Sequence, residues 1–119
     1  MWLRIGGILM FFGVALGAFG SHALRSRLDE YSFDVYRTAV FYHLIHALAI
    51  FIVAHLASLF NDAKIQWAGI LFVAGIILFS GSLYLLAVTG QKLWGILTPF
   101  GGIAFLVAWL LVAFSGFYL

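Results

Sequence analysis

Four long stretches without a charged side chain constrain this sequence more than any other feature. With histidine set aside, no charged residue occurs in Ile5–Leu24, Thr38–Asn61, Ile65–Gln91 or Leu93–Leu119, and each stretch holds at least twenty residues. A helix needs about 20 residues, at ~1.5 Å per residue, to cross the ~30 Å hydrocarbon layer of a bilayer. We therefore predict an all-α membrane protein, a four-transmembrane-helix bundle with helices roughly over 4–24, 36–60, 65–89 and 94–118 in one domain of residues 1–119.

The composition supports lipid as the solvent. Hydrophobic residues make up 66% of the chain and charged residues 8%, whereas soluble domains are about half apolar and a quarter charged. The stretches are continuously apolar rather than alternating, which argues against a transmembrane β-barrel. The first stretch, with Ser21-His22-Ala23 near its end, also resembles a secretory signal with a cleavage site. We favour an uncleaved span, because three further spans follow it.

The charged residues and cysteine content exclude several classes of function. A net charge of +2 is too small to indicate nucleic acid as a partner, and the absence of cysteine excludes thiolate metal sites and cysteine nucleophiles. No Asp or Glu lies inside a predicted span, which removes the usual paired-carboxylate chemistry. The sequence also lacks a Walker loop and a dinucleotide fingerprint. We predict a protein that is not an enzyme and has no cofactor and no metal site.

The segment Arg25–Arg37 is the main polar connector. It holds six of the ten Asp, Glu, Lys and Arg residues with both signs interspersed, and we predict a solvated loop with weak salt bridges. Ser32 or Asp34 is predicted to cap the start of the second helix. Pro99, the only proline, either follows a Thr98 N-cap as the first residue of the fourth helix or kinks a span that begins earlier.

Aromatic and basic residues indicate how the chain lies in the membrane. Trp and Tyr favour the two membrane–water interfaces. We therefore expect one interface to hold Trp2, Trp67 and Tyr118, and the other to hold Tyr31, Tyr36 and Trp94. The connector face carries four Lys or Arg residues and the N-terminal face carries two, so the positive-inside rule favours both termini outside by a margin of two residues, and both orientations stay open.

Glycines mark one face of the first helix. They are Gly6, Gly13, Gly17 and Gly20, at spacings of seven, four and three residues. Small residues let membrane helices approach closely, so this face is predicted to pack against another helix, within the chain or between chains. Short echoes between the first and third helices, such as Gly20-Ser21 and Gly81-Ser82, hint at two fused helical hairpins.

Polar side chains inside the spans gather near the connector face. They are Ser21, His22, Tyr42, His43, His46, Ser80, Ser82, Tyr84 and Thr98, and helical rise places them within roughly 12 Å of that interface. His55 is the exception, close to the opposite face. Ionisable groups inside a bilayer are functional candidates by default, and His46 is the strongest because it lies deepest. The alternative, which we favour, is interhelical hydrogen-bond glue worth ~0.6 kcal/mol per bond.

A metal or haem site is the sharpest form of the functional hypothesis. His43 and His46 stand at i,i+3, but no carboxylate or thiolate accompanies them in the spans. Haem needs axial ligands from facing helices. His22 and His46 are the obvious pair, yet helical rise separates their depths by about 9 Å, which argues against them.

Four motifs resemble those of a known membrane family. They are Gly17-Ala18-Phe19-Gly20-Ser21-His22-Ala23-Leu24, the segment from Thr38 to Leu48, Phe79-Ser80-Gly81-Ser82-Leu83-Tyr84, and Thr98-Pro99-Phe100-Gly101-Gly102. They are similar to the GAFGAHAL, TAxxYxxxHAL, FSGSLY and TPxGG motifs of the domain-of-unknown-function 423 family (UPF0382), which includes the transmembrane protein 256-like proteins. The resemblance covers nearly the whole chain. It implies a four-span membrane protein, bacterial or mitochondrial, without an established activity.

The resemblance also implies which residues the family pattern specifies. Its pattern positions fall on His22, Tyr42, His46, Ser80, Ser82, Tyr84, Thr98 and Pro99. The pattern does not require histidine at the position of His43, which weakens an i,i+3 metal pair. This chain has Ser21 where the motif usually has alanine. It lacks the basic C-terminal tail of some relatives, a tail that argues for termini inside.

These features together predict a multi-pass protein of the bacterial cell membrane, or of a mitochondrial membrane if the source is eukaryotic. We predict a scaffold or accessory subunit of unestablished activity. Its expected partners are membrane lipid and either a second copy of the chain, bound through the glycine face, or another membrane protein. The alternative is a small ligand-, proton- or metal-binding membrane protein that uses the His/Tyr/Ser cluster near one membrane face.

Overall fold

The structure, a computed structural model that describes residues 1–116, contains four helical spans. They run over Trp2–Leu24, Glu30–Leu59, Ala63–Thr89 and Lys92–Ala113, and each is long and apolar enough to cross a membrane. The predicted fold class, an all-α protein with four transmembrane helices, is confirmed.

Three of the spans combine α-helix with another helical geometry. The segments are α1 (Trp2–Val14), π-helical η1 (Ala15–Gly20), α2 (Ser21–Leu24), α3 (Glu30–Leu59), α4 (Ala63–Gly75), π-helical η2 (Ile76–Ser80), α5 (Gly81–Thr89), 3₁₀-helical η3 (Lys92–Ile96) and α6 (Thr98–Ala113). Each π segment lies beside one of the Gly-Ser pairs that echo each other in the sequence, Gly20-Ser21 and Gly81-Ser82. The first and third spans therefore share an irregularity at matching places.

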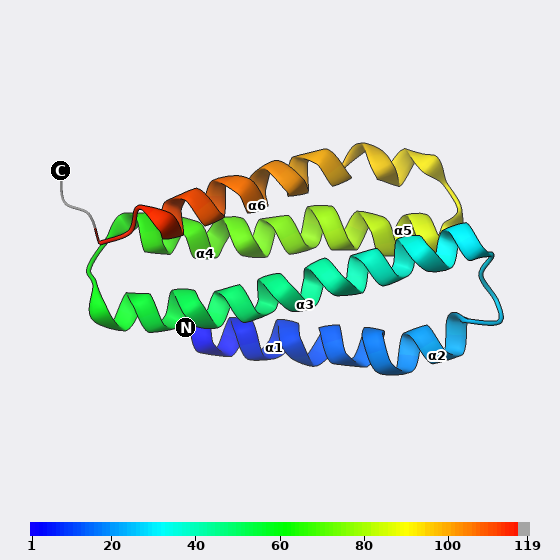
Figure 1. Cartoon of the computed structure of the whole chain (residues 1–119), viewed down its shortest axis with the longest axis horizontal. Coiled ribbons are helices and arrows are strands. Elements are labelled where there is room, and N and C mark those ends of the chain that lie inside the picture. The colour runs from blue at the N-terminus through cyan, green and yellow to red at the C-terminus, as the bar shows by residue number, and fades with distance from the viewer. Residues whose placement is uncertain (117–119) are drawn as a thin grey trace.

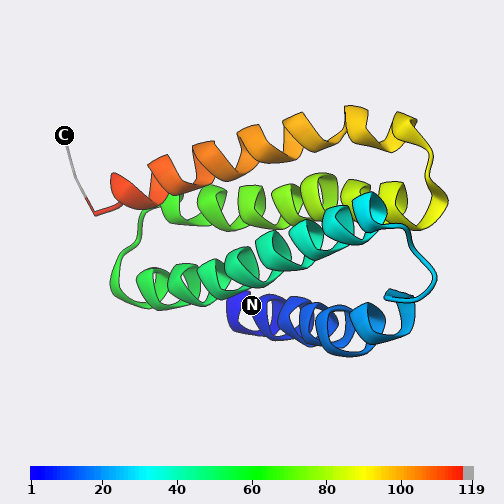
Figure 2. The ribbon, with the colours of Figure 1, turned by 45° about the vertical axis from the view of Figure 1, so that its right-hand side comes forward.

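The four spans form a flattened bundle. Figures 1 and 2 show them side by side in the order first span, α3, third span, fourth span, so that α1 and α6 occupy the outer positions. The Cα atoms extend over 51 × 26 × 17 Å. Only 11% of the most apolar part of the first span and 22% of the fourth are buried, against 39% in each central span. The outer helices therefore turn most of their surface toward lipid.

Helix α3 begins earlier than predicted because a different residue caps it. Asp29 is the N-cap, and its carboxylate accepts a hydrogen bond from the Ser32 backbone N–H at 2.7 Å. This hydrogen bond lowers the pKa of the Asp29 carboxyl below its ordinary value. The predicted cap at Ser32 or Asp34 was wrong, since both residues lie inside the helix. In the described part of the chain, the charged side chains of the connector also form none of the predicted salt bridges with one another.

The start of α6 combines the two alternatives for Pro99. The span begins at Lys92 in 3₁₀ geometry and becomes α-helical at Thr98, with Pro99 in the first turn, where no intrahelical N–H is needed. Leu97, not Thr98, is the N-cap residue. The Thr98 hydroxyl instead contacts Ser82 Oγ at 2.6 Å. Proline therefore marks a change of helical geometry within one crossing.

At the opposite end of the bundle, Asp62 holds the end of the described chain. Its carboxylate accepts hydrogen bonds from the Lys64 backbone N–H at 2.9 Å and the Gly116 N–H at 3.0 Å, and it lies 3.2 Å from Lys64 Nζ. The bonds from Gly116 and Lys64 lower the pKa of Asp62. Helix α6 ends at Ala113, before the predicted limit, and the predicted anchor Tyr118 lies outside the described residues.

The glycine face of the first span packs against α3 of the same chain. A Cβ atom added at Gly13 would lie 2.8 Å from Leu44 Cδ2, and one at Gly17 would lie 2.9 Å from Val40 Cγ1. At Gly6 the nearest atom is Ile50 Cγ2 at 3.3 Å, and at Gly20 the Tyr36 hydroxyl would be overlapped. Of the two packing modes predicted for these four glycines, the structure has the one within the chain. Gly13 is buried in this contact, and Gly17 and Gly20 are half-buried.

Two aromatic residues expected at the interfaces are buried instead. Trp2 is 7% exposed, packs over Gly69, and donates its indole N–H to Gln66 Oε1 at 2.8 Å. Tyr36 is 2% exposed and donates its hydroxyl to the Leu16 carbonyl at 2.5 Å. Each ring packs against a glycine of another helix and has a hydrogen-bond acceptor within reach. Both side chains are therefore buried between helices and do not lie at the membrane–water interface.

Candidate functional site

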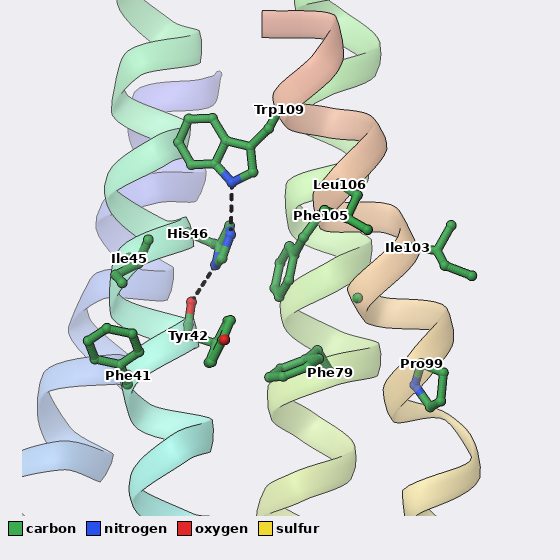
Figure 3. A pocket seen from close by; sticks show the side chains of 11 residues that line it. Phe41, Tyr42, Ile45, His46, Phe79, Pro99, Ile103, Phe105, Leu106 and Trp109 are labelled. Atoms are coloured by element: carbon green, nitrogen blue, oxygen red, sulfur yellow. Dashed lines mark hydrogen bonds between the residues drawn. The ribbon is translucent and has the colours of Figure 1, made fainter. Parts of the chain in front are cut away.

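His46 lies near the middle of α3, where a helix of this length is deepest in the membrane. Its Nδ1 contacts the Tyr42 carbonyl oxygen at 2.7 Å, and the Trp109 indole N–H donates to its Nε2 at 3.1 Å (Figure 3). A carbonyl only accepts and an indole only donates, so Nδ1 carries the proton and Nε2 does not. The ring is 5% exposed and stacks on Phe105, with the ring centroids 3.6 Å apart. His46 is therefore a neutral imidazole with both nitrogens engaged.

His43 is the second buried histidine and has the opposite tautomer. Its Nε2 donates to the Leu9 carbonyl at 2.7 Å, so its Nδ1 is the acceptor for the Tyr84 hydroxyl at 2.9 Å. One ring thus connects α1, α3 and α5. The family pattern does not specify this histidine, and its sequence signal is the helix face that it shares with His46 at i,i+3.

The serine and threonine residues of the cluster bridge the remaining helices. Ser80 is fully buried and donates to the Ala39 carbonyl of α3 at 2.8 Å. Ser82 Oγ lies 2.6 Å from Thr98 Oγ1, which joins α5 to α6. Together with Tyr84, these residues lie on helices that face one another.

Within residues 1–116, the side chains of Tyr42 and His22 do not form hydrogen bonds between helices as the other residues of the predicted cluster do. The Tyr42 ring packs 4.5 Å from the Phe79 ring centroid and parallel to His46, but it is the Tyr42 backbone carbonyl that binds the histidine. His22 is exposed and lies in a separate cavity at the membrane face, with Ser21, Arg25 and Arg37. The structure therefore brings His46 together with Tyr42 but does not bring it together with His22.

A groove between α3 and α6 opens beside His46. Its volume is about 550 Å³. Its walls include Tyr42, Phe79, Pro99, Gly102 and Trp109. Figure 3 shows His46 between Tyr42 and Trp109, with Phe79 and Pro99 further along the groove. Apart from the imidazole the lining is almost wholly apolar or aromatic. The groove suits a hydrocarbon group better than a polar or charged one.

The chemistry available at this site is limited by its hydrogen bonds. Neither buried histidine has a free ring nitrogen, so neither can take a proton or a metal ion without first losing a bond to a neighbouring helix or to its own backbone. No group of three or more His, Asp or Glu side chains within residues 1–116 is placed to hold a metal ion.

Fold and site together define a multi-pass integral membrane protein in which polar side chains link four apolar helices. The chain belongs to the family of proteins of unknown function DUF423, whose model matches residues 16–102. It is 42% identical to the UPF0382 membrane protein YwdK of Bacillus subtilis over 113 residues, covering 94% of this chain and 92% of that protein.

Other relatives are similar over nearly their whole length. The UPF0382 membrane protein SAB0533 of Staphylococcus aureus is 34% identical over 98% of this chain and 95% of its own. The UPF0382 inner membrane protein YgdD of Escherichia coli K12 is 37% identical over 92% of this chain and 84% of its own. No solved structure matches significantly. The relatives are bacterial membrane proteins, which agrees with the predicted family and location.

Proposed function

We propose that this protein is a structural subunit of the membrane, a scaffold or accessory protein without catalytic chemistry of its own. The observation that carries the proposal is the complete hydrogen bonding of His43 and His46. A histidine kept for proton transfer or ligand binding needs one nitrogen that can change its partner. Here a change of partner at the acceptor nitrogen would leave the Tyr84 hydroxyl or the Trp109 N–H unpaired within the hydrocarbon region, which is costly.

The cluster has a clear structural use. Five hydrogen bonds between spans connect all four: His43 to Leu9 and to Tyr84, Ser80 to Ala39, Ser82 to Thr98, and Trp109 to His46. At ~0.6 kcal/mol each, they contribute roughly 3 kcal/mol in total. Membrane helices have little hydrophobic driving force for association, because lipid is as apolar as the helix surfaces, so directional hydrogen bonds help van der Waals packing to fix the geometry of the bundle.

One observation favours a second candidate function, the binding of a small apolar ligand. The groove of about 550 Å³ between α3 and α6 is large enough for part of a hydrocarbon molecule, and His46, Tyr42 and Trp109 line it. If the protein binds such a ligand, the hydrogen-bonded cluster fixes the shape of the groove and takes no part in a chemical reaction there.

The purified protein in detergent separates these functions. We would record its visible spectrum, its metal content and its extracted apolar molecules for the wild type and for His46→Phe, which keeps the stacked ring but removes both nitrogens. A structural subunit has no stoichiometric chromophore or metal, and its His46→Phe variant unfolds at a lower temperature. A stoichiometric metal or chromophore that is lost in His46→Phe would refute the structural proposal.

A matched pair of glycine variants tests the groove. A Cβ at Gly102 meets only Phe79 Cδ2 at 3.9 Å, so Gly102→Leu fills the groove without a backbone clash, and Gly7→Leu adds the same side chain where nothing lies within 4 Å. The ligand-binding candidate requires an apolar molecule that is retained by Gly7→Leu and lost from Gly102→Leu. Equal retention in both variants excludes the groove as the ligand-binding site.

A separate experiment addresses the scaffold role. Proteins that co-purify with this chain from native membranes would identify the partner of a scaffold.

A further inference from the structure

A polar cavity lies where the first span ends and α3 begins. It has a volume of about 360 Å³. It is lined by Ala18, Ser21, His22, Arg25, Phe33 and Arg37. Two guanidinium groups, one imidazole and one hydroxyl thus face a space whose lining includes no carboxylate. The electrostatic character of the cavity is that of a site for an anion.

The fold does not use these cationic groups. The side chains of His22, Arg25 and Arg37 are exposed and make no hydrogen bond or ion pair with any residue in 1–116. This contrasts with His43 and His46, whose nitrogens are all engaged. Arginine presents several N–H donors in a planar fork that matches the oxygens of a phosphate, and two free arginines beside one cavity are suited to bind it.

An apolar groove continues from this cavity into the membrane. It has a volume of about 370 Å³, shares Ser21, Phe33 and Arg37 with the cavity, and extends past Val40 and Leu44. Along α3, the seven steps from Arg37 to Leu44 correspond to a rise of about 10 Å. The combined space is therefore polar at the end of the spans and apolar further along α3, the direction in which the helix is expected to enter the hydrocarbon layer.

We propose that this combined space binds one anionic phospholipid, with its phosphate at Arg25 and Arg37 and an acyl chain along Val40 and Leu44. A soluble phosphate ester or an acidic peptide would leave the apolar groove unused, whereas a phospholipid matches both parts in their order along the membrane normal. The site is separate from the hydrogen-bonded cluster and does not depend on the proposed function.

Native mass spectrometry of the detergent-purified full chain tests the proposal. We would titrate the wild type with phosphatidylglycerol and with phosphatidylcholine of the same acyl chains. A cationic residue near a membrane surface strengthens binding of anionic lipid by about fivefold. Two arginines thus predict roughly thirtyfold tighter binding of phosphatidylglycerol. Equal affinities for the two lipids would overturn the proposal, and this comparison needs no variant.

Variants then locate the site. Arg25→Gln and Arg37→Gln should each lower the affinity for phosphatidylglycerol about fivefold. Arg27→Gln removes the same charge from the same connector, but Arg27 lines neither the cavity nor the groove, so this variant should bind like the wild type. An equal loss in Arg27→Gln would show that only the overall surface charge matters and would refute a defined site.

A soluble competitor distinguishes a lipid from a free phosphate. Excess glycerol phosphate carries the anionic group without acyl chains, so it should not displace bound phosphatidylglycerol. Full displacement would show that the cavity is a soluble-phosphate site and that the apolar groove contributes nothing. Thermal unfolding of each variant confirms that the arginine changes, which are on exposed side chains, leave the bundle folded.

Discussion

The adjacent glycines Gly101 and Gly102 at the start of α6 should respond to the same substitution in opposite directions. Helix α6 crosses the third span at Gly101, where an added Cβ would overlap the Phe79 backbone nitrogen and lie 2.8 Å from its Cα. At Gly102 the one atom within 4 Å among residues 1–116 is Phe79 Cδ2, at 3.9 Å, which is ordinary contact. A side chain can rotate away from a new methyl group, but the backbone of a neighbouring helix cannot.

The two variants can be compared quantitatively. Replacing Gly by Ala inside a helix is favourable by ~1 kcal/mol at both positions. Overpacking adds a cost of ~1–3 kcal/mol, and it applies only at Gly101. The helix-propensity gain cancels in the comparison, so Gly101→Ala should be less stable than Gly102→Ala by that overpacking cost alone. Gly102→Ala should equal or exceed the wild type in stability.

The assay is reversible unfolding of the two variants and the wild type in mixed micelles, followed by far-ultraviolet circular dichroism as denaturing detergent is added. Thermal unfolding in mild detergent provides an independent ranking. Equal stability of the two variants, or a more stable Gly101→Ala, would refute the close approach of α6 to the Phe79 backbone.

Three further predictions follow from the packing, the hydrogen bonds and the loop at the opposite end. Gly13→Leu should lower stability by ~1–3 kcal/mol because its side chain meets α3, whereas Gly7→Leu should not, and thermal unfolding of both variants checks this. A double-mutant cycle with His43→Phe and Tyr84→Phe should give a coupling energy of ~0.6 kcal/mol and at most ~1.7, and a value of zero would contradict the bond between them. Hydrogen bonds lower the pKa of folded Asp62 below the unfolded value of about 3.9. Its contribution to stability is therefore present above that value and lost as the pH falls through the folded pKa. Unfolding temperatures of the wild type should thus decline in acid more steeply than those of Asp62→Asn, and parallel curves would contradict the assignment.

The polar cluster shows how far sequence reasoning reached at the candidate site. Depth along the helices placed His46, Ser80, Ser82 and Thr98 near one another, and the structure joins them through hydrogen bonds to facing helices. Depth also grouped His22 with them, although it lies in a different cavity. Counting residues gives the position of a side chain along its helix. It does not give the rotation of the helix about its axis, which decides the neighbour toward which the side chain points.

Contacts with residues on other spans explain the remaining differences between the predictions and the structure. Trp2 carries the usual signal of an interface residue, but Gly69 and Gln66 on another span offer it a slot and an acceptor. His43 carried less weight than His46 because the family motif does not require it, yet its two nitrogens reach two other spans. A hydrogen-bond acceptor on a helix more than thirty residues away leaves no local trace in the sequence.

The sequence by itself determined the four apolar spans, the all-helical class and the position of each polar residue along its span, because a bilayer fixes the length of a span and forbids an unpaired backbone within it. Tertiary structure decided which face of each helix turns inward, and with it the partners of His43, the burial of Trp2 and the difference between Gly101 and Gly102. The physical reason is that lipid is as apolar as a protein core. A transmembrane helix can therefore be apolar on every side, and only its fit against neighbouring helices selects the buried face.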